Sequence, residues 1–398
     1  MTSVDSRCQR RTRGRNDTRP RPARLRRIHR AAGEESFELN QTETSSPLPS
    51  PRDGTNLLHT VFGLLAAIVG GLLFNWLGIP LAYILGAMTG SALYANLLGP
   101  LTGTREIRRA GQLIIGSAVA ALLTPAVIAD LARLFPFMIA VAVGLNVAGG
   151  LLAIPVARIA GVDRLSALLA CLPAGMAEMA TLARELKAQE HVVALIHTLR
   201  VILVVSILPL LVGVSDAAVA RVPTAYDPFT LAAFALFLAA GALLALLAGR
   251  LGLLNAWIVA PMALGLVLAA LGASLPPLPT LIVILAQLAI GASLGSRFQV
   301  RELRALPRAT VAGLFSAIVF VAIAPVGLAA LVQMVSALDF STLALALAPG
   351  GMGEMIASAK ALGIASATVA GFQFVRTAMT NLLVPLIIRG WIARRGTA

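Results

Sequence analysis

Two short motifs contain the residues of this chain that are best suited to chemistry. Pro173-Ala-Gly-Met-Ala-Glu-Met179 returns 176 residues later as Pro349-Gly-Gly-Met-Gly-Glu-Met355. Proline lacks an N–H and glycine is permissive, so Pro173 with Gly175, and Pro349 with Gly351, are predicted to break a helix. The helix that restarts after each break offers free N–H groups and a positive dipole end, which attract an anion.

Glu178 and Glu354 lie in the first turn of these restarting helices. Each could simply stabilise its own helix start. Both also lie between apolar arms, where a carboxylate is costly unless it is paired or protonated. We therefore predict that the two glutamates form a proton- or cation-coupling site, with local helix stabilisation as the alternative.

Arg200 and Arg376 occur at matching positions inside the last apolar segment of each half. An arginine inside a membrane needs a partner, and the glutamates are candidates for that role. Two interpretations remain open: a Glu–Arg pair that braces the broken helix, or a guanidinium that holds a solute carboxylate or phosphate. His197 and Gln373 precede the arginines by three residues, so they share a helix face with them and could line the same cavity.

The composition indicates a membrane protein. Of 398 residues, 58% are hydrophobic and 13% are charged, whereas a soluble domain is about one quarter charged. This excludes a soluble enzyme, because the polar residues cannot cover its surface. Two cysteines and four histidines are too few for a disulfide framework or a metal cluster, and no nucleotide-binding or nucleophile motif is present. We expect no enzyme activity, no cofactor and no metal.

The chain contains an internal duplication. Between residues 163 and 209, 14 of 47 positions are identical to those 176 residues later, and Gln112-Leu-Ile-Ile-Gly116 matches Gln287-Leu-Ala-Ile-Gly291. We predict an Arg-rich, disordered cytoplasmic tail (1–53), membrane repeat 1 (54–213), a connecting loop (214–228) and membrane repeat 2 with a short basic C-terminal tail (229–398).

Positive charge predicts that the repeats are inverted. The first half has its arginine cluster after its second apolar segment, and the second half has it after its third segment; the two clusters are Arg105, Arg108 and Arg109, and Arg297, Arg301, Arg304 and Arg308. Because positive loops stay in the cytoplasm, the swap requires an odd number of crossings per half. We expect an all-α polytopic protein with five crossings and one broken or re-entrant helix per repeat, as in many secondary transporters.

The paired Pro-x-Gly-Met-x-Glu-Met motifs, with Arg200 and Arg376 downstream, resemble those of the membrane AbrB duplication family over roughly residues 57–393. The resemblance implies a bacterial inner-membrane protein with an internal duplication. Members of that family are described as regulators of gene expression or as ammonia monooxygenase-like proteins. The small, soluble, DNA-binding AbrB is a different protein, whose compact fold this chain cannot adopt.

The leading hypothesis is an inner-membrane secondary transporter for a small, anionic solute, with both termini in the cytoplasm. The alternative is a membrane sensor or regulator that uses the same cavity without flux, and the least favoured is an ammonia monooxygenase-like enzyme, because nitrogen ligands are too few. The expected partners are the lipid bilayer and a small molecule or ion, without specific nucleic acid. A homo-oligomer is left open.

Overall fold

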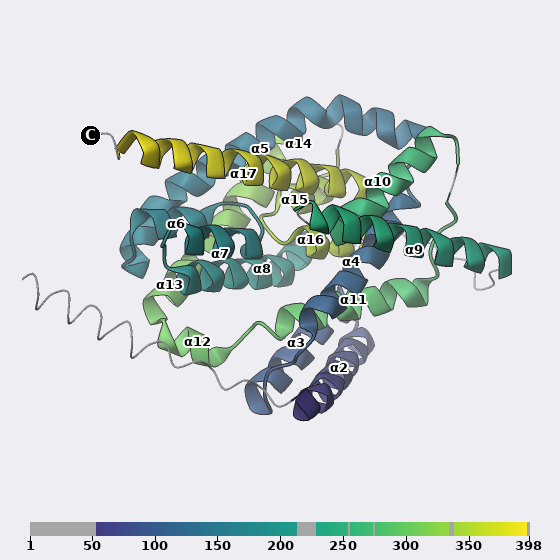
Figure 1. The fold of residues 1–398 in the computed structure, drawn as a ribbon, viewed down its shortest axis with the longest axis horizontal. Coiled ribbons are helices and arrows are strands. Elements are labelled where there is room, and N and C mark those ends of the chain that lie inside the picture. The colour runs from purple at the N-terminus through teal and green to yellow at the C-terminus, as the bar shows by residue number, and fades with distance from the viewer. Residues whose placement is uncertain (1–52, 213–227, 254, 274, 334–337, 396–398) are drawn as a thin grey trace, which may run out of the picture. The chain divides into compact units, whose positions relative to one another are not determined.

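The computed structural model describes residues 53–212, 228–253, 255–273, 275–333 and 338–395 (Figure 1). Every element in this part of the chain is helical. The first half contains α2 (Asp53–Trp76), α3 (Ala82–Leu97), α4 (Thr104–Ala120), α5 (Pro125–Ala160), α6 (Arg164–Cys171), α7 (Met176–Glu185) and α8 (Glu190–Val212). The second contains α9 (Pro228–Arg250), α10 (Ala256–Ala270), α11 (Thr280–Gly295), α12 (Val300–Ala305), α13 (Pro307–Val321), the π-helical turn η1 (Ala322–Leu328), α14 (Ala329–Gln333), α15 (Phe340–Leu347), α16 (Met352–Ala361) and α17 (Ser366–Arg395).

Five helical segments are long and apolar enough to cross a membrane. They are Leu58–Trp76, Pro125–Ala160, Glu190–Leu208, Thr230–Arg250 and Thr280–Ala305. Ala256–Ala270 and Pro307–Val321 are shorter apolar helices. Many large apolar side chains on these helices, such as Leu72, Leu151 and Leu236, are exposed. A protein surface of this kind suits lipid, in which helices keep their backbone polar groups satisfied.

The two halves share a series of equivalent elements, although α12 has no counterpart in the first half and α13, η1 and α14 stand where the first half has α5. Helices α6 and α15 each have eight residues, and α7 and α16 each have ten. The turn after α7 contains Lys187 at φ 56°, and the turn after α16 contains Gly363, 176 residues later, at φ 68°. The duplication seen in the residues is therefore also present in the backbone.

Helices of the first repeat pack against non-equivalent helices of the second repeat. Helix α3 packs on α11 and α4 packs on α10, while α5 packs on α17 and α8 packs on α13. Small residues allow the first two contacts: a Cβ on Gly116 would lie 2.6 Å from the carbonyl oxygen of Ile258, and a Cβ on Gly291 would lie 2.4 Å from that of Ile84. Gly116 with Ile258 thus forms the same contact as Gly291 with Ile84, with the two repeats interchanged. A pseudo-two-fold axis between the repeats produces this pattern.

The helices form two groups by their contacts, one on each side of the fold in Figure 1. The first bundle contains α2–α4 and α9–α11, and the second bundle contains α5–α8 and α13–α17. Each repeat therefore contributes its first three helices to one bundle and its later helices to the other, with the short α12 connecting the two bundles in the second repeat. The main contacts between the bundles place α16 against α4 and α11.

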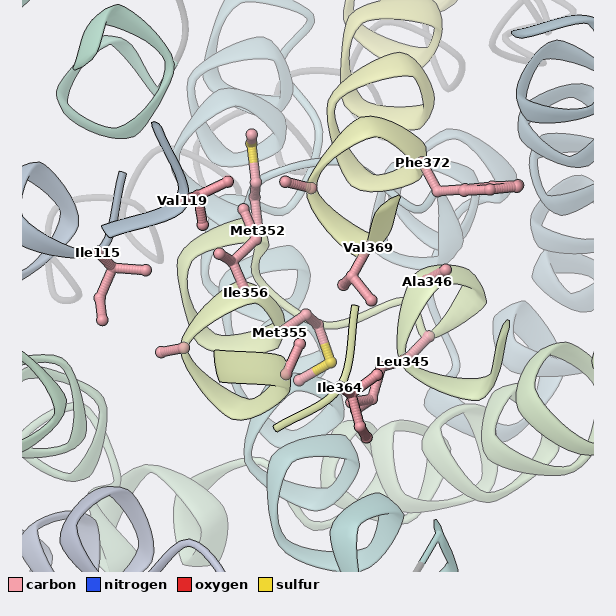
Figure 2. Close-up of a cluster of buried hydrophobic side chains, with 14 of the residues drawn as sticks. Ile115, Val119, Leu345, Ala346, Met352, Met355, Ile356, Ile364, Val369 and Phe372 are labelled. Atoms are coloured by element: carbon pink, nitrogen blue, oxygen red, sulfur yellow. The ribbon is translucent and has the colours of Figure 1, made fainter. Parts of the chain in front are cut away.

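The short helix α16 is at the centre of the larger buried core. Figure 2 shows apolar side chains of α4, α15, α16 and α17 gathered around it. Ile115, Met355, Ile356, Val369 and Phe372 are all buried. Close packing of these side chains gains dispersion contacts, so α16 is held on several sides rather than lying exposed at a surface.

The expectation of an all-helical protein is confirmed for the described residues. The inverted orientation and the ten crossings stay predictions. The expected tail (1–53), the connecting loop (214–228) and the end of the C-terminal tail lie almost entirely outside the described residues.

Candidate functional site

Both predicted helix breaks lie between two short helices. Pro173 and Gly175 separate α6 from α7, and Pro349 and Gly351 separate α15 from α16. Gly175 and Gly351 precede the restarting helices with nearly identical backbone angles, φ −70° with ψ 141° and φ −70° with ψ 140°. Neither helix has a side-chain cap on its N-terminal residue.

Each glutamate folds back onto the glycine three residues before it. A Cβ on Gly175 would lie 1.8 Å from Oε2 of Glu178, and a Cβ on Gly351 would lie 2.0 Å from Oε2 of Glu354. The backbone angles would admit any residue, so glycine is needed here for space rather than for conformation. Both carboxylates consequently lie over the N-terminal end of their own helix, where the dipole favours negative charge.

Arg200 supports the first break from the inside. The side chain is buried, and Nη1 donates to the carbonyl oxygens of Cys171 and Leu172, both at 3.2 Å. Nη2 donates to Nδ1 of His197 at 2.8 Å, and Nε2 of His197 donates to the carbonyl of Leu169 at 2.9 Å. The guanidinium and the imidazole therefore satisfy carbonyl groups that the end of α6 leaves without helical partners.

Arg376 and Gln373 do the same at the second break. Arg376 donates to the carbonyls of Ala348 and Gly350. Nε2 of Gln373 lies 2.9–3.2 Å from the carbonyls of Leu345, Ala346 and Ala348. Thus both intramembrane arginines contact the backbone of the break, and the expected pairing with the motif glutamates is replaced by this contact. In addition, Arg376 lines the inner pocket described below, whereas Arg200 does not.

The ion partner of Glu354 is Arg108. Nη1 of Arg108 lies 2.6 Å from Oε1 of Glu354, whose side chain is 0% exposed. Neither carboxylate oxygen has a hydrogen bond of regular geometry within the described residues, so the contact is an ion pair by distance alone. Arg108 belongs to α4 and Glu354 to α16, so this ion pair joins the two bundles.

Glu178 has a different environment, although it is the equivalent residue. It is partly exposed and lines an open cavity of 680 Å³, the outer cavity, together with Arg108, Gln112 and Arg297. Glu185, Arg105 and Arg109 also line it, so four arginines face two glutamates. Arg109 lies over the ring of Trp257 at 5.6 Å. The wall of the outer cavity is therefore predominantly basic.

A smaller pocket of 110 Å³, the inner pocket, lies between the two breaks. It shares Arg108, Glu178, Asn255 and Arg297 with the outer cavity. The remaining wall is formed by backbone and side chains of both breaks and of the helices behind them: Ala174, Gly175, Met176, His197, Thr198, Val201, Gly350, Gly351, Met352, Arg376 and Thr377, with Leu294 from α11. The inner pocket thus lies between the bundles, next to the outer cavity.

The predicted site residues come together only in part. Glu178, His197, Arg376, Gly175 and Gly351 line the inner pocket. Glu354 lies directly behind Gly351, while Arg200, Gln373, Pro173 and Pro349 lie outside the pocket wall. Whether this group binds a solute stays a prediction.

Two arginines that line both cavities were absent from the predicted site. By sequence alone, Arg108 and Arg297 are positive charges that predict the cytoplasmic side. One signal was available for Arg108: it precedes Gln112 by four residues, and both residues line the outer cavity from α4. Arg297 comes after the end of α11, and only packing places it near Glu178 and Glu354.

In the described residues, no group of three or more histidine, cysteine, aspartate or glutamate side chains is arranged to hold a metal ion. The polar groups of the site are guanidinium, carboxylate, amide and imidazole groups together with backbone atoms. This set is suited to binding an ion or a small polar solute.

Comparison with known proteins agrees with the motifs. Residues 92–392 match the family model described as transition state regulatory protein AbrB. A stretch of 160 residues is 29% identical to the uncharacterized protein YhjN of Bacillus subtilis, covering 38% of this chain and 42% of that protein. The chain thus spans less than half the length of the curated relative it matches. Since the family model covers most of the sequence, and the fold has long apolar helices, this chain is a membrane protein that belongs to the AbrB family.

Proposed function

We propose that this protein is a secondary transporter of the bacterial inner membrane that moves a small anionic solute together with a proton or a cation. The observation that carries the proposal is the basic outer cavity, which leads to a small pocket between two broken helices. In membrane proteins, irregular backbone is tolerated where it lines a cavity, and transporters place their binding sites at such breaks.

The charges of the site favour an anion. Arg108, Arg297 and Arg376 line the inner pocket, and Glu178 is the one acidic residue in its described wall. The N-terminal ends of α7 and α16 point their dipoles at the same region. Arginine suits carboxylate or phosphate groups because its planar fork binds them in a bidentate manner.

The difference between the two glutamates supports alternating access. Glu178 faces the open cavity, while its equivalent Glu354 is sealed behind Gly351. Two repeats of similar sequence need not occupy the same environment at the same time. In the proposed cycle, a relative shift of the bundles would expose Glu354 to the opposite side of the membrane and seal Glu178.

The proposed topology is that of two inverted repeats with five crossings each and cytoplasmic termini. Support comes from the crosswise packing and from the position of Arg108 and Arg297, which come from the two arginine clusters and line one cavity. A reporter fused near Arg301 is expected to be cytoplasmic. A periplasmic reporter would contradict the topology.

The test of transport is flux into liposomes that contain the purified protein. Acetate, succinate, phosphate and sulfate are offered with and without an inward proton gradient, and thermal stabilisation in detergent identifies those that bind. Arg108→Gln is expected to abolish both stabilisation and flux. Matched Arg133→Gln is a control, because Arg133 is exposed and lies outside both cavities. A folded protein that binds and transports none of the four anions would contradict the proposal.

A sensor or regulator of gene expression is the second candidate, favoured by the description of the family model. It would use the same cavity without moving the solute. Stabilisation by an anion without flux in liposomes would support the sensor over the transporter. We do not propose enzyme activity, because the described site lacks a recognisable arrangement of nucleophile and base.

A further inference from the structure

Arg108 has two environments at once. Its guanidinium neutralises Glu354 at 2.6 Å, and the same side chain, 19% exposed, lines the outer cavity and the inner pocket. An anion that enters from the outer cavity would therefore contact the same guanidinium that neutralises Glu354. This gives a physical route from solute binding to the charge of a buried carboxylate.

Glu354 has little else to neutralise it. The other charged or titratable groups that line the inner pocket or hold its breaks are Arg297, Glu178, His197, Arg200 and Arg376. Lys360 lies in the last turn of α16, and the elements packed on α16 also carry Arg105, Glu106 and Arg109 (α4) and Glu190 and His191 (α8). Arg200 and Arg376 donate to backbone carbonyls, and His197 is held between Arg200 and Leu169. Arg297 lines both cavities and acts electrostatically on Glu354 and Glu178, but the cation in direct contact with Glu354 is Arg108.

We propose that the solute anion and Glu354 compete for Arg108, so that Glu354 takes up one proton when the anion binds. This inference rests on the proposed function and specifies how its coupling works. The guanidinium stays charged throughout and exchanges one carboxylate for the carboxylate or phosphate of the solute. A proton from the aqueous cavity adds to Glu354, because a sealed carboxylate without a counter-ion is costlier than a neutral acid. One anion and one proton thus bind together.

The proton would reach Glu354 from the inner pocket. Oε2 of Glu354 lies over Gly351, and Gly351 lines the inner pocket. Neither carboxylate oxygen has a hydrogen-bond partner within the described residues, and Oε1 is the oxygen in contact with Arg108. The proposal therefore places the proton on Oε2, which lies nearer to Gly351 than Oε1 does.

The exchange also affects the contact between the bundles. Arg108 is on α4 of the first bundle and Glu354 is on α16 of the second. While they are paired, the ion pair holds the bundles together in the observed arrangement. Binding of the anion with a proton removes this ion pair, so only the loaded protein is released to shift.

The first experiment measures binding of sulfate and acetate to the detergent-solubilised protein, because both ions keep their charge between about pH 6 and pH 8. Uptake of one proton makes the apparent dissociation constant fall by about tenfold for each unit of decrease in pH. Glu354→Gln is expected to bind without this dependence. Glu106→Gln is the matched control, since Glu106 is exposed on α4 near Arg108, and it should keep the wild-type slope.

The outcomes separate the two proposals. The proposed linkage between anion binding and proton uptake by Glu354 is overturned if the wild type binds anions independently of pH, or if Glu354→Gln keeps the wild-type pH dependence. Neither result contradicts anion transport. Failure of both anions, and of succinate and phosphate, to bind a folded protein overturns the proposed function and the linkage with it. Should Glu354→Gln not fold, the slope of the wild-type protein decides.

A second experiment needs no ligand. Arg108→Gln removes the counter-ion in contact with Glu354, and under the proposal the carboxylate takes up a proton in the folded protein. The loss in Tm relative to the wild type is expected to grow between about pH 6 and pH 8, and the Arg108→Gln/Glu354→Gln double variant should abolish that growth. A loss in Tm that is the same at every pH would contradict the role assigned to Glu354.

Discussion

Replacing Gly351 by alanine should destabilise the protein far more than replacing Gly175, although the two glycines are equivalent. In both, the new Cβ would overlap a carboxylate oxygen, at 2.0 Å for Glu354 and at 1.8 Å for Glu178. Both backbones tolerate alanine. The difference lies in where the displaced carboxylate can go.

Glu178 borders the open outer cavity and can swing into it, whereas Glu354 is sealed and paired with Arg108. Breaking a buried ion pair costs about 3–5 kcal/mol. Alanine returns about 0.4–1 kcal/mol by restricting the unfolded chain. Gly351→Ala should therefore lose roughly 2–4 kcal/mol of unfolding free energy, and Gly175→Ala should stay within about 1 kcal/mol of the wild type.

The assay is unfolding of each variant in the same detergent at neutral pH, followed by circular dichroism. In a Glu354→Gln background, Gly351→Ala should cost less than it costs the wild type, because the ion pair is already absent. Equal losses in the two glycine variants, or a stable Gly351→Ala, would refute the reasoning, since the ion pair and the sealed environment of Glu354 would then not matter.

Three further predictions follow from the packing. Arg200→Lys should lower the unfolding free energy by about 2–3 kcal/mol, because a lysine ammonium cannot reproduce the hydrogen bonds that the planar guanidinium makes to two carbonyls and to His197. Thermal unfolding tests this prediction, and wild-type stability of the variant would contradict it. Gly291→Leu should prevent α3 from packing on α11 and give an aggregated protein by size-exclusion chromatography, whereas Gly144→Leu, at a position with open space, should remain monodisperse. In a variant without native cysteines, Glu178→Cys should react with a water-soluble thiol reagent and Glu354→Cys should not; equal reactivity would show that both sites are open.

Several features follow from the sequence because their causes are local or compositional. A chain that is 58% hydrophobic cannot cover a soluble surface, and proline with glycine favours a break in a helix. The repeated motif places both breaks correctly at Pro173-x-Gly and Pro349-x-Gly, whereas the unrepeated Pro325-x-Gly lies inside η1 without a loop. The duplication is equally visible, since equal spacing of equivalent residues needs no coordinates.

The partners of the buried charges could not be predicted in this way. For Arg200 and Arg376 the sequence left open a pair with a glutamate or a contact with a solute; in the structure each contacts carbonyls next to a short helix, and contact with a solute stays a prediction. Those carbonyls lose their helical partners at the break, so they compete for the guanidinium. The acceptor that each guanidinium binds depends on the distance between α8 and α6 for Arg200, and between α17 and α15 for Arg376. Sequence spacing does not determine that distance.

The difference between Glu178 and Glu354 is the feature that only the tertiary structure decides. Their motifs are nearly the same, so local sequence predicts the same environment for both. Their surroundings differ because α16 packs against α4 and α11 of the other bundle, which places Arg108 on Glu354, while α7 borders the open cavity. Duplication and helix breaks are therefore determined by the residues themselves, whereas exposure and ion pairing depend on how two bundles, each drawn from both repeats, lie against each other.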